Sequence, residues 1–192
     1  MPKLILLGTA SAVADEDHEN THMVIVGQDG AVLIDCVASP RIRLGRAGIV
    51  LDDIGDLIVT HFHPDHVSGV PLLLMNMWLS GRRKPLRIYG LHHCLERLED
   101  MMGFYHWEKW PRFFPVAFHR LPEQERVLVL EKDGYRILAS PVRHLVPTIG
   151  LRIESDQAEG VKVVAYSCDT EPTPSVVHLA SGADVLLHES SG

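Results

Sequence analysis

The sequence predicts a mixed α/β (α+β) fold in which layered β-sheets are covered by helices. Hydrophobic residues make up 46% of the chain and charged residues 22%, which is ordinary for a soluble globular protein and argues against disorder. Short β runs recur with helices at intervals, and several of the runs are joined by hairpin turns rather than by helices. We expect residues 1–192 to form a single domain, because 192 residues can bury one sizeable core.

The elements follow from apolar runs and turn residues. In the first part of the chain we predict strands over residues 3–7, 23–26, 31–35, 57–60 and 86–89, and helices over residues 40–47, 66–79 and 91–102. Asp29-Gly30 predicts a hairpin between two of these strands. Prolines interrupt the aromatic residues 104–118, which favours a packed loop or a lid. Later strands are predicted over residues 127–130, 135–139, 149–153, 161–166 and 184–187, with a helix over 172–180.

Charge and apolar patterning indicate where the protein acts. Lys plus Arg number 18 against 25 for Asp plus Glu, a formal net charge of −7, so any contact with nucleic acid is local. The start of the chain is a poor secretory signal, and the apolar run over residues 70–79 is shorter than the roughly 20 residues that cross a bilayer. We expect a cytoplasmic protein without membrane contact. Three cysteines without C-x-x-C spacing predict neither a disulfide framework nor a thiolate zinc site.

A metal-binding pattern follows the predicted strand that ends at Thr60. His61 and His63 are two residues apart, so in an extended segment they point to the same side and can hold one ion. Asp65 and His66 come next, and imidazole with carboxylate suits a catalytic zinc site. Four such side chains exceed what one tetrahedral ion uses, which favours two adjacent ions. A single structural metal, or a surface loop with incidental histidines, is the alternative.

These residues match the His-x-His-x-Asp-His signature, and the chain resembles the metallo-β-lactamase superfamily. The resemblance extends over LLGTASAV near the start, VLIDC at residues 32–36, PVRHLVPTIGLRIES at 141–155, YSCDT at 166–170 and ADVLLHES at 183–190. Within the superfamily, these segments are most similar to ribonuclease Z, the transfer-RNA 3′-processing endonuclease, and to related phosphodiesterases. The resemblance implies a four-layer αββα sandwich with a two-metal site at one edge.

The resemblance also implies a ligand set. One ion would be held by His61, His63 and His144, a second by Asp65 and His66, and both by a bridging Asp169. The implied cofactors are two divalent metal ions, with zinc as the first choice and manganese as the alternative. From the residues alone, His144 could be an ordinary loop histidine and Asp169 a turn residue or helix N-cap.

Three residues are candidates for catalysis, namely Asp65, His188 and Glu189. Two ions about 3.5–4 Å apart can hold a bridging water and lower its pKa, and Asp65 is placed to orient that water. His188 and Glu189 match the family's His-Glu-Ala-Thr element, here His-Glu-Ser-Ser, in which the histidine would help to protonate the leaving oxygen. Read alone, His188 could be an ordinary histidine at a strand end.

Two features depart from ribonuclease Z. The family has a further metal-binding histidine beyond the His-Glu-Ala-Thr element, whereas this sequence stops at Gly192. We expect that a C-terminal part of the sandwich is missing, although a weak second site or a ligand from a partner would also account for this. The family's transfer-RNA arm lies between the elements matching His144 and Asp169, where this chain has only residues 145–168. A smaller phosphodiester is therefore favoured over transfer RNA.

Candidate substrate-binding residues lie elsewhere in the sequence. A basic cluster could bind phosphate and consists of Arg82, Arg83 and Lys84 with Arg87, supported by Arg41, Arg43 and Arg46. A solvated turn is the alternative. Trp107 and Trp110 could cap the site and stack a base, or they could form hydrophobic packing or a dimer contact.

The leading hypothesis is a metal-dependent, ribonuclease Z-like phosphodiesterase or endoribonuclease. Its partners would be a phosphodiester substrate, with RNA as one candidate, and a second copy of the chain, because relatives of ribonuclease Z are commonly homodimers. Three other functions stay open: a hydrolase of lactones, thioesters or other carboxylic derivatives, a flavin-linked di-iron redox protein, and a non-catalytic scaffold. The redox pattern has Glu where this chain has His63, which disfavours it.

Overall fold

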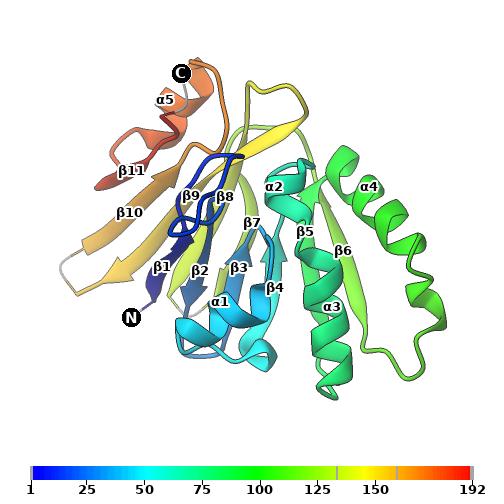
Figure 1. Ribbon diagram of the computed structural model, residues 1–192. Coiled ribbons are helices and arrows are strands. Elements are labelled where there is room, and N and C mark those ends of the chain that lie inside the picture. Colours follow the sequence, from blue (N-terminus) through cyan, green and yellow to red (C-terminus); the bar gives the residue numbers. More distant parts are fainter. Residues whose placement is uncertain (1, 133, 159, 191–192) are drawn as a thin grey trace.

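Two β-sheets pack face to face, and helices cover their outer faces (Figure 1). The computed structural model describes residues 2–132, 134–158 and 160–190. The first sheet has the order β1-β2-β3-β4-β5-β6, with strands Lys3–Gly8, His22–Val26, Ala31–Ile34, Ile54–Ile58, Leu86–Leu91 and Val116–Leu121. The second has the order β11-β10-β9-β8-β7, with strands Val185–Leu187, Gly160–Tyr166, Thr148–Gln157, Tyr135–Val142 and Val127–Lys132. This is the predicted αββα arrangement.

The helices connect strands that run in parallel. In the first sheet β3 to β6 are parallel, and three helices pack on its outer face: α1 (Pro40–Arg46), α3 (Val70–Leu79) and α4 (His92–Gly103). Among the described residues of the second sheet, β10 and β11 form the parallel pair, and α5 (Pro174–Ala180) joins them. Parallel strands need such crossover connections, whereas the antiparallel pairs are joined by turns. The carboxyl ends of the parallel strands lie at one edge of the sandwich, where loop residues from both sheets can meet.

The fold has two hydrophobic cores, one between the first sheet and its helices and one between the two sheets, and alternate residues of a strand face one or the other. Val24 and Leu33 face the helices α1, α3 and α4, whereas their neighbours Met23 and Ile34 face the second sheet. All four side chains are buried, and burial of a side chain of this size stabilises the fold by about 1.5–3 kcal/mol. A shift of one residue would turn each set to the wrong core, so the alternation fixes the register of the strands.

The predicted hairpin is confirmed, and one predicted helix is wrong. β2 and β3 pair antiparallel, and Gly30 has the positive φ (122°) that the turn requires. The single helix predicted over residues 66–79 is divided into α2 (Pro64–Val67) and α3. The two helices are separated at Gly69, whose added Cβ would lie 2.7 Å from the carbonyl oxygen of Val37. The N–H of Gly69 donates to Cys36 O at 2.9 Å, so the break holds α2 against the end of β3.

The aromatic segment 104–118 packs at the end of α3 that is remote from α2 (Figure 1). Trp110 stacks on Trp78, in the last turn of α3, with ring centroids 4.8 Å apart. Trp78 Nε1 donates to Pro111 O at 3.0 Å, and Trp107 packs against the same core. Trp107 and Trp110 therefore take part in hydrophobic packing and do not lie beside the histidines. In the part of the chain that the structure describes, no helix is long and apolar enough to cross a bilayer.

Candidate metal centre

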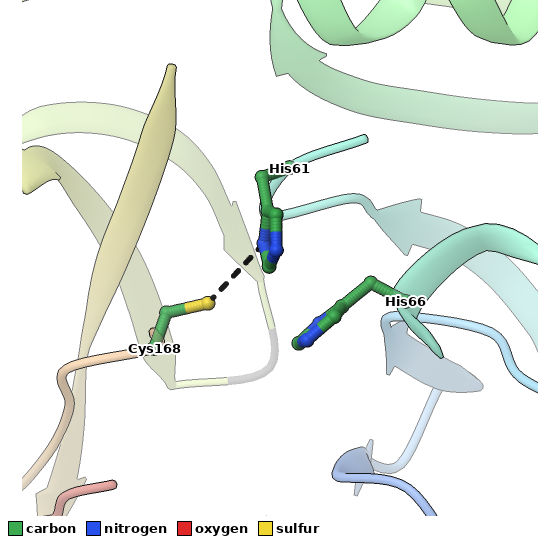
Figure 2. A group of neighbouring side chains, drawn as sticks. All are labelled: His61, His66 and Cys168. Carbon is green, nitrogen blue, oxygen red and sulfur yellow. Dashed lines mark hydrogen bonds between the residues drawn. The ribbon is translucent and has the colours of Figure 1, made fainter. Parts of the chain in front are cut away.

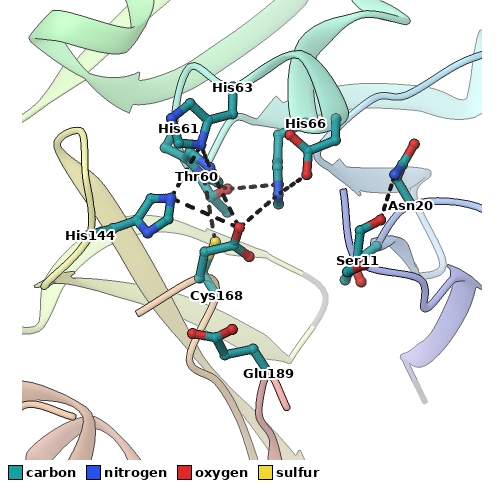
Figure 3. Close-up of polar contacts among 12 residues, drawn as sticks. Ser11, Asn20, Thr60, His61, His63, His66, His144, Cys168 and Glu189 are labelled. Atoms are coloured by element: carbon teal, nitrogen blue, oxygen red, sulfur yellow. Dashed lines mark hydrogen bonds and ion pairs between the residues drawn. The ribbon is translucent and has the colours of Figure 1, made fainter. Parts of the chain in front are cut away.

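The six predicted metal ligands meet at one edge of the sandwich (Figure 3). They come from separate places in the chain: His61 and His63 follow β4, Asp65 and His66 belong to α2, His144 lies between β8 and β9, and Asp169 follows β10. Residues more than 80 positions apart are therefore brought together by the ends of strands from both sheets.

Three imidazole nitrogens form the first set of donors. His63 Nδ1 lies 3.0 Å from His61 Nε2 and 3.2 Å from His144 Nε2. Ligand atoms that are about 2.0–2.1 Å from one tetrahedral zinc ion lie about 3.3 Å from each other, so these separations fit a common ion. The three nitrogens are therefore close enough to one another to hold a first metal ion.

Two carboxylates and one imidazole form the second set. His66 Nε2 lies 3.6 Å from Asp65 Oδ2 and 3.6 Å from Asp169 Oδ2. Asp169 Oδ2 is also 3.9 Å from His61 Nε2 and 3.9 Å from His144 Nε2, so its carboxylate lies between the two sets. Carboxylate and imidazole donors suit zinc or manganese. The arrangement fits the bridging position that the resemblance implies for Asp169.

Burial and neighbouring charges set the protonation of the histidines. Burial, reinforced by the charge of His66, lowers the pKa of His61 to about 2, and burial followed by the nearby His144 lowers the pKa of His63. Both rings are therefore neutral at physiological pH, the form that binds a metal. Burial alone would lower the pKa of His66, but the carboxylates of Asp35 and Asp169 outweigh it and raise the pKa to about 10.

Asp35 supports the centre from behind, and the sequence analysis missed it as a site residue. Its Oδ2 accepts hydrogen bonds from His66 Nδ1 and from Thr60 Oγ1, each at 2.8 Å, and its Oδ1 accepts one from the Thr60 N–H at 2.8 Å. The side chain is fully buried at the end of β3, and its φ of 57° is left-handed. A lone acidic residue that ends an apolar strand was the available signal. Because Nδ1 of His66 is held by Asp35, Nε2 points toward the second donor set.

Cys168 lies behind His61 (Figure 2). Its Sγ is 3.7 Å from His61 Nδ1, the nitrogen opposite the one that faces His63. Burial raises the pKa of the Cys168 thiol well above its ordinary value, so the sulfur stays protonated. His61, His66 and Cys168 are close enough to form a third group of donor atoms, although the sequence predicts no thiolate site. The protonated thiol acts here as an outer contact of His61.

His188 and Glu189 border the same centre. Together with Asp65, His66 and Asp169 they line a cavity of about 690 Å³, which continues along the loop after β1. His188 Nδ1 lies 2.8 Å from Ser167 Oγ, and Glu189 Oε1 accepts a hydrogen bond from the Thr170 N–H at 2.9 Å. The predicted catalytic residues are thus beside the predicted ligands and anchored to the loop that carries Asp169.

The predicted phosphate-binding residues Arg82, Arg83 and Lys84 are not brought to this centre. They follow the last turn of α3, whereas the histidines precede its first turn. Arg82 is 5% exposed, and its Nε and Nη2 donate to the carbonyl oxygens of Lys84 and Pro85, each at 2.8 Å. Arg82 therefore holds its own loop together. A substrate role for the three residues stays a prediction.

The fold and the site define a metal-dependent hydrolase of the metallo-β-lactamase superfamily, as the resemblance implied. A family model described as Anti-Pycsar protein Apyc1 matches residues 2–191. The chain therefore belongs to this family.

Curated relatives and solved structures with the same fold match most of the chain. Ribonuclease Z of Methanothermobacter thermautotrophicus is 28% identical over 242 residues, covering 100% of this chain and 75% of the relative. Ribonuclease Z of Mycobacterium bovis is 29% identical and covers 98% of this chain and 70% of the relative.

Among solved structures, the short form of human tRNase Z is 20% identical with a TM-score of 0.76, covering 97% of this chain and 76% of that one. A diphosphatase of the PhnP family is 19% identical with a TM-score of 0.72, covering 97% of this chain and 73% of that one. These relatives are longer than the chain.

Proposed function

We propose that the chain is a phosphodiesterase that uses two divalent ions, with zinc as the first choice, and acts on a small phosphodiester. The observation that carries this proposal is the position of Asp169, whose carboxylate lies between the histidines of the first donor set and His66 of the second, beside a cavity. Similarity to relatives named ribonuclease Z and to a PhnP-family diphosphatase supports phosphate chemistry. The single domain, the homodimer and the cytoplasmic location expected from the sequence are parts of the same proposal.

The size of the substrate is inferred from the segment between His144 and Asp169. β9 and β10 occupy most of this segment, and all of β10 pairs antiparallel with residues 151–157 of β9. Among the described residues there is no other chain between them that could form a protruding arm for transfer RNA. The cavity of about 690 Å³ falls in the range of roughly 300–1,000 Å³ typical of small-molecule sites. Both features favour a small substrate.

The chain's own residues would position the reaction. Bound divalent ions supply a water of lowered pKa and neutralise charge on the phosphodiester. The carboxylate of Asp65 can accept a hydrogen bond from the attacking water and so orient it. Ser167 Oγ donates to Cys168 O at 2.8 Å, so it accepts a hydrogen bond from the Nδ1–H of His188 at 2.8 Å. A protonated His188 then has its Nε2–H available for the leaving oxygen, which is the role of a general acid.

Hydrolysis of carboxylic derivatives is a second candidate function. One observation favours it: the cavity lining contains no lysine or arginine among the described residues, so the protein itself offers phosphate little positive charge. Bis(p-nitrophenyl) phosphate, a lactone and a thioester, each assayed with zinc and with manganese, separate the two candidates. We expect the phosphodiester to be hydrolysed fastest. Faster hydrolysis of the lactone or the thioester would overturn the proposal in favour of the second function.

Replacing His188 by alanine tests its role as the acid. We expect kcat to fall about 10²- to 10⁴-fold for a phosphodiester with an alkyl alcohol as leaving group, because an alkoxide needs a proton. The loss should be much smaller for p-nitrophenol, which leaves as an anion. The matched control is His178→Ala, which removes an imidazole that is 62% exposed on α5. An equal loss with both leaving groups would exclude general acid catalysis by His188.

A further inference from the structure

A second cavity, of about 660 Å³, lies at the far end of α3 from the metal centre. Its lining comes from α1, from residues 49–52 and from the end of α3 with the loop that follows. The ten residues of α3, at about 1.5 Å of rise each, separate the cavity from Gly69 and the histidines by about 15 Å. Figure 1 shows α1 beside this lower end of α3, away from α2. The cavity is therefore distinct from the candidate metal centre.

This cavity is basic in an acidic protein. Its lining contains Arg41, Arg82, Arg83 and Lys84 and one acidic residue, Asp52, a balance of 4 − 1 = +3, whereas the whole chain has a formal net charge of −7. Lys84 Nζ is 2.9 Å and Arg82 Nη1 3.6 Å from a carboxylate oxygen of Asp52. Because Asp52 is shared by these two cations, a net positive charge is left for an anion from solution.

Two guanidinium groups retain donors for such an anion. Arg41 Nη1 donates to Ser80 Oγ at 3.3 Å, and Arg83 Nη1 donates to Arg112 O at 2.9 Å. A guanidinium has five N–H donors in a planar fork, so one hydrogen bond each leaves most of this capacity unused. Both side chains lie in the cavity lining. Paired N–H groups of arginine match phosphate oxygens better than lysine does.

The rest of the lining is firm and partly apolar. Arg82 is nearly buried and is bound to backbone carbonyl groups, which holds the loop that carries Arg83. Ile49, Leu51 and Met77 are buried behind the cavity, and Val50 is 62% exposed at its side. An apolar wall beside guanidinium groups suits a ligand with a flat base and a phosphate group. Its volume is also in the range of sites that hold small molecules.

We propose that this cavity binds a nucleotide through its phosphate group, independently of the hydrolytic centre. The phosphate is held by Arg41 and Arg83, and the base lies against the apolar side of the lining at Ile49, Val50 and Leu51. A free nucleotide and a strand of RNA both carry a base and a phosphate group. An RNA bound at the metal centre would have to extend about 15 Å along α3 to reach this second cavity.

Binding measurements by calorimetry test the site with three probes: adenosine 5′-diphosphate, a single-stranded hexauridylate RNA and inorganic phosphate. We expect R41E/R83E to weaken adenosine diphosphate binding at least about tenfold, because charge-assisted hydrogen bonds are lost. The control R97E/R120E makes the same change in charge at exposed residues outside the cavity lining and should have little effect. R41Q/R83Q serves as the test variant if the charge reversal prevents folding.

The His63→Ala variant separates this site from the proposed function. We expect it to bind adenosine diphosphate as the unmodified chain does, even where hydrolysis is lost. Tighter binding of the RNA than of adenosine diphosphate, with the same dependence on Arg41 and Arg83, would identify a strand as the natural source of the phosphate. Binding that does not depend on these arginines, binding that disappears in His63→Ala, or equal affinity for inorganic phosphate would overturn the proposal.

Discussion

Replacing His63 by alanine is expected to lower hydrolysis by several orders of magnitude while the fold persists. His63 Nδ1 is the donor atom shared by the two shortest contacts of the first set, at 3.0 Å to His61 and 3.2 Å to His144. The loss of activity in this variant should exceed the roughly 10- to 100-fold effect of removing an outer partner of a metal ligand. The side chain is only half-buried and belongs to neither core cluster, so packing should survive. Measurements of kcat/KM, metal content and circular dichroism together check this.

His92→Ala is the matched control for this variant. It removes an imidazole that is 67% exposed at the start of α4, so activity and metal content should stay unchanged. If His63→Ala kept most of its activity and a full complement of metal, the first donor set would not be the catalytic centre.

Replacing Asp35 by asparagine is expected to weaken metal binding about 10- to 100-fold and to destabilise the fold by about 3 kcal/mol. The carboxylate accepts three hydrogen bonds, from His66 Nδ1, Thr60 Oγ1 and the Thr60 N–H. An amide has only one oxygen, so its NH₂ group must face at least one of these donors in a fully buried position. Chelator competition measures the affinity and urea denaturation the stability, both at a temperature at which the variant is folded.

The control for Asp35→Asn is Asp100→Asn, an exposed carboxyl on α4. It makes the same chemical change without touching the centre, and neither affinity nor stability should move by more than about 0.5 kcal/mol. A variant at position 35 that loses stability but binds metal normally would show that Asp35 supports the fold without orienting His66.

Local patterns predicted much of the fold and of the candidate site. The ligands His61, His63, Asp65 and His66 are neighbours in the sequence, so their spacing alone indicates a shared site. His144 needed the family resemblance, because no local pattern connects a loop of the second sheet with β4. The hairpin at Asp29-Gly30 was predictable because its turn is encoded by adjacent residues.

Other features depend on contacts between distant segments and were not predictable. The role of Asp35 requires that β3 and β4 lie side by side, which brings Thr60 and His66 to its carboxylate. The division of the helix predicted over residues 66–79 depends on the close approach of Gly69 to Val37. Charge alone likewise could not show that Arg82 is buried in its own loop at the far end of α3.

The tight fit at Gly69 limits how the metal-binding motif can be transplanted. An added side chain would meet backbone atoms of residues 36–37, so saturation mutagenesis should recover only glycine at this position. A protein engineer who grafts residues 61–66 onto another scaffold must therefore also supply a neighbouring strand end with the same backbone path. Segments 35–37 and 60–69 must be transferred together. The histidine motif by itself would lack the strand end that holds its short helix in place.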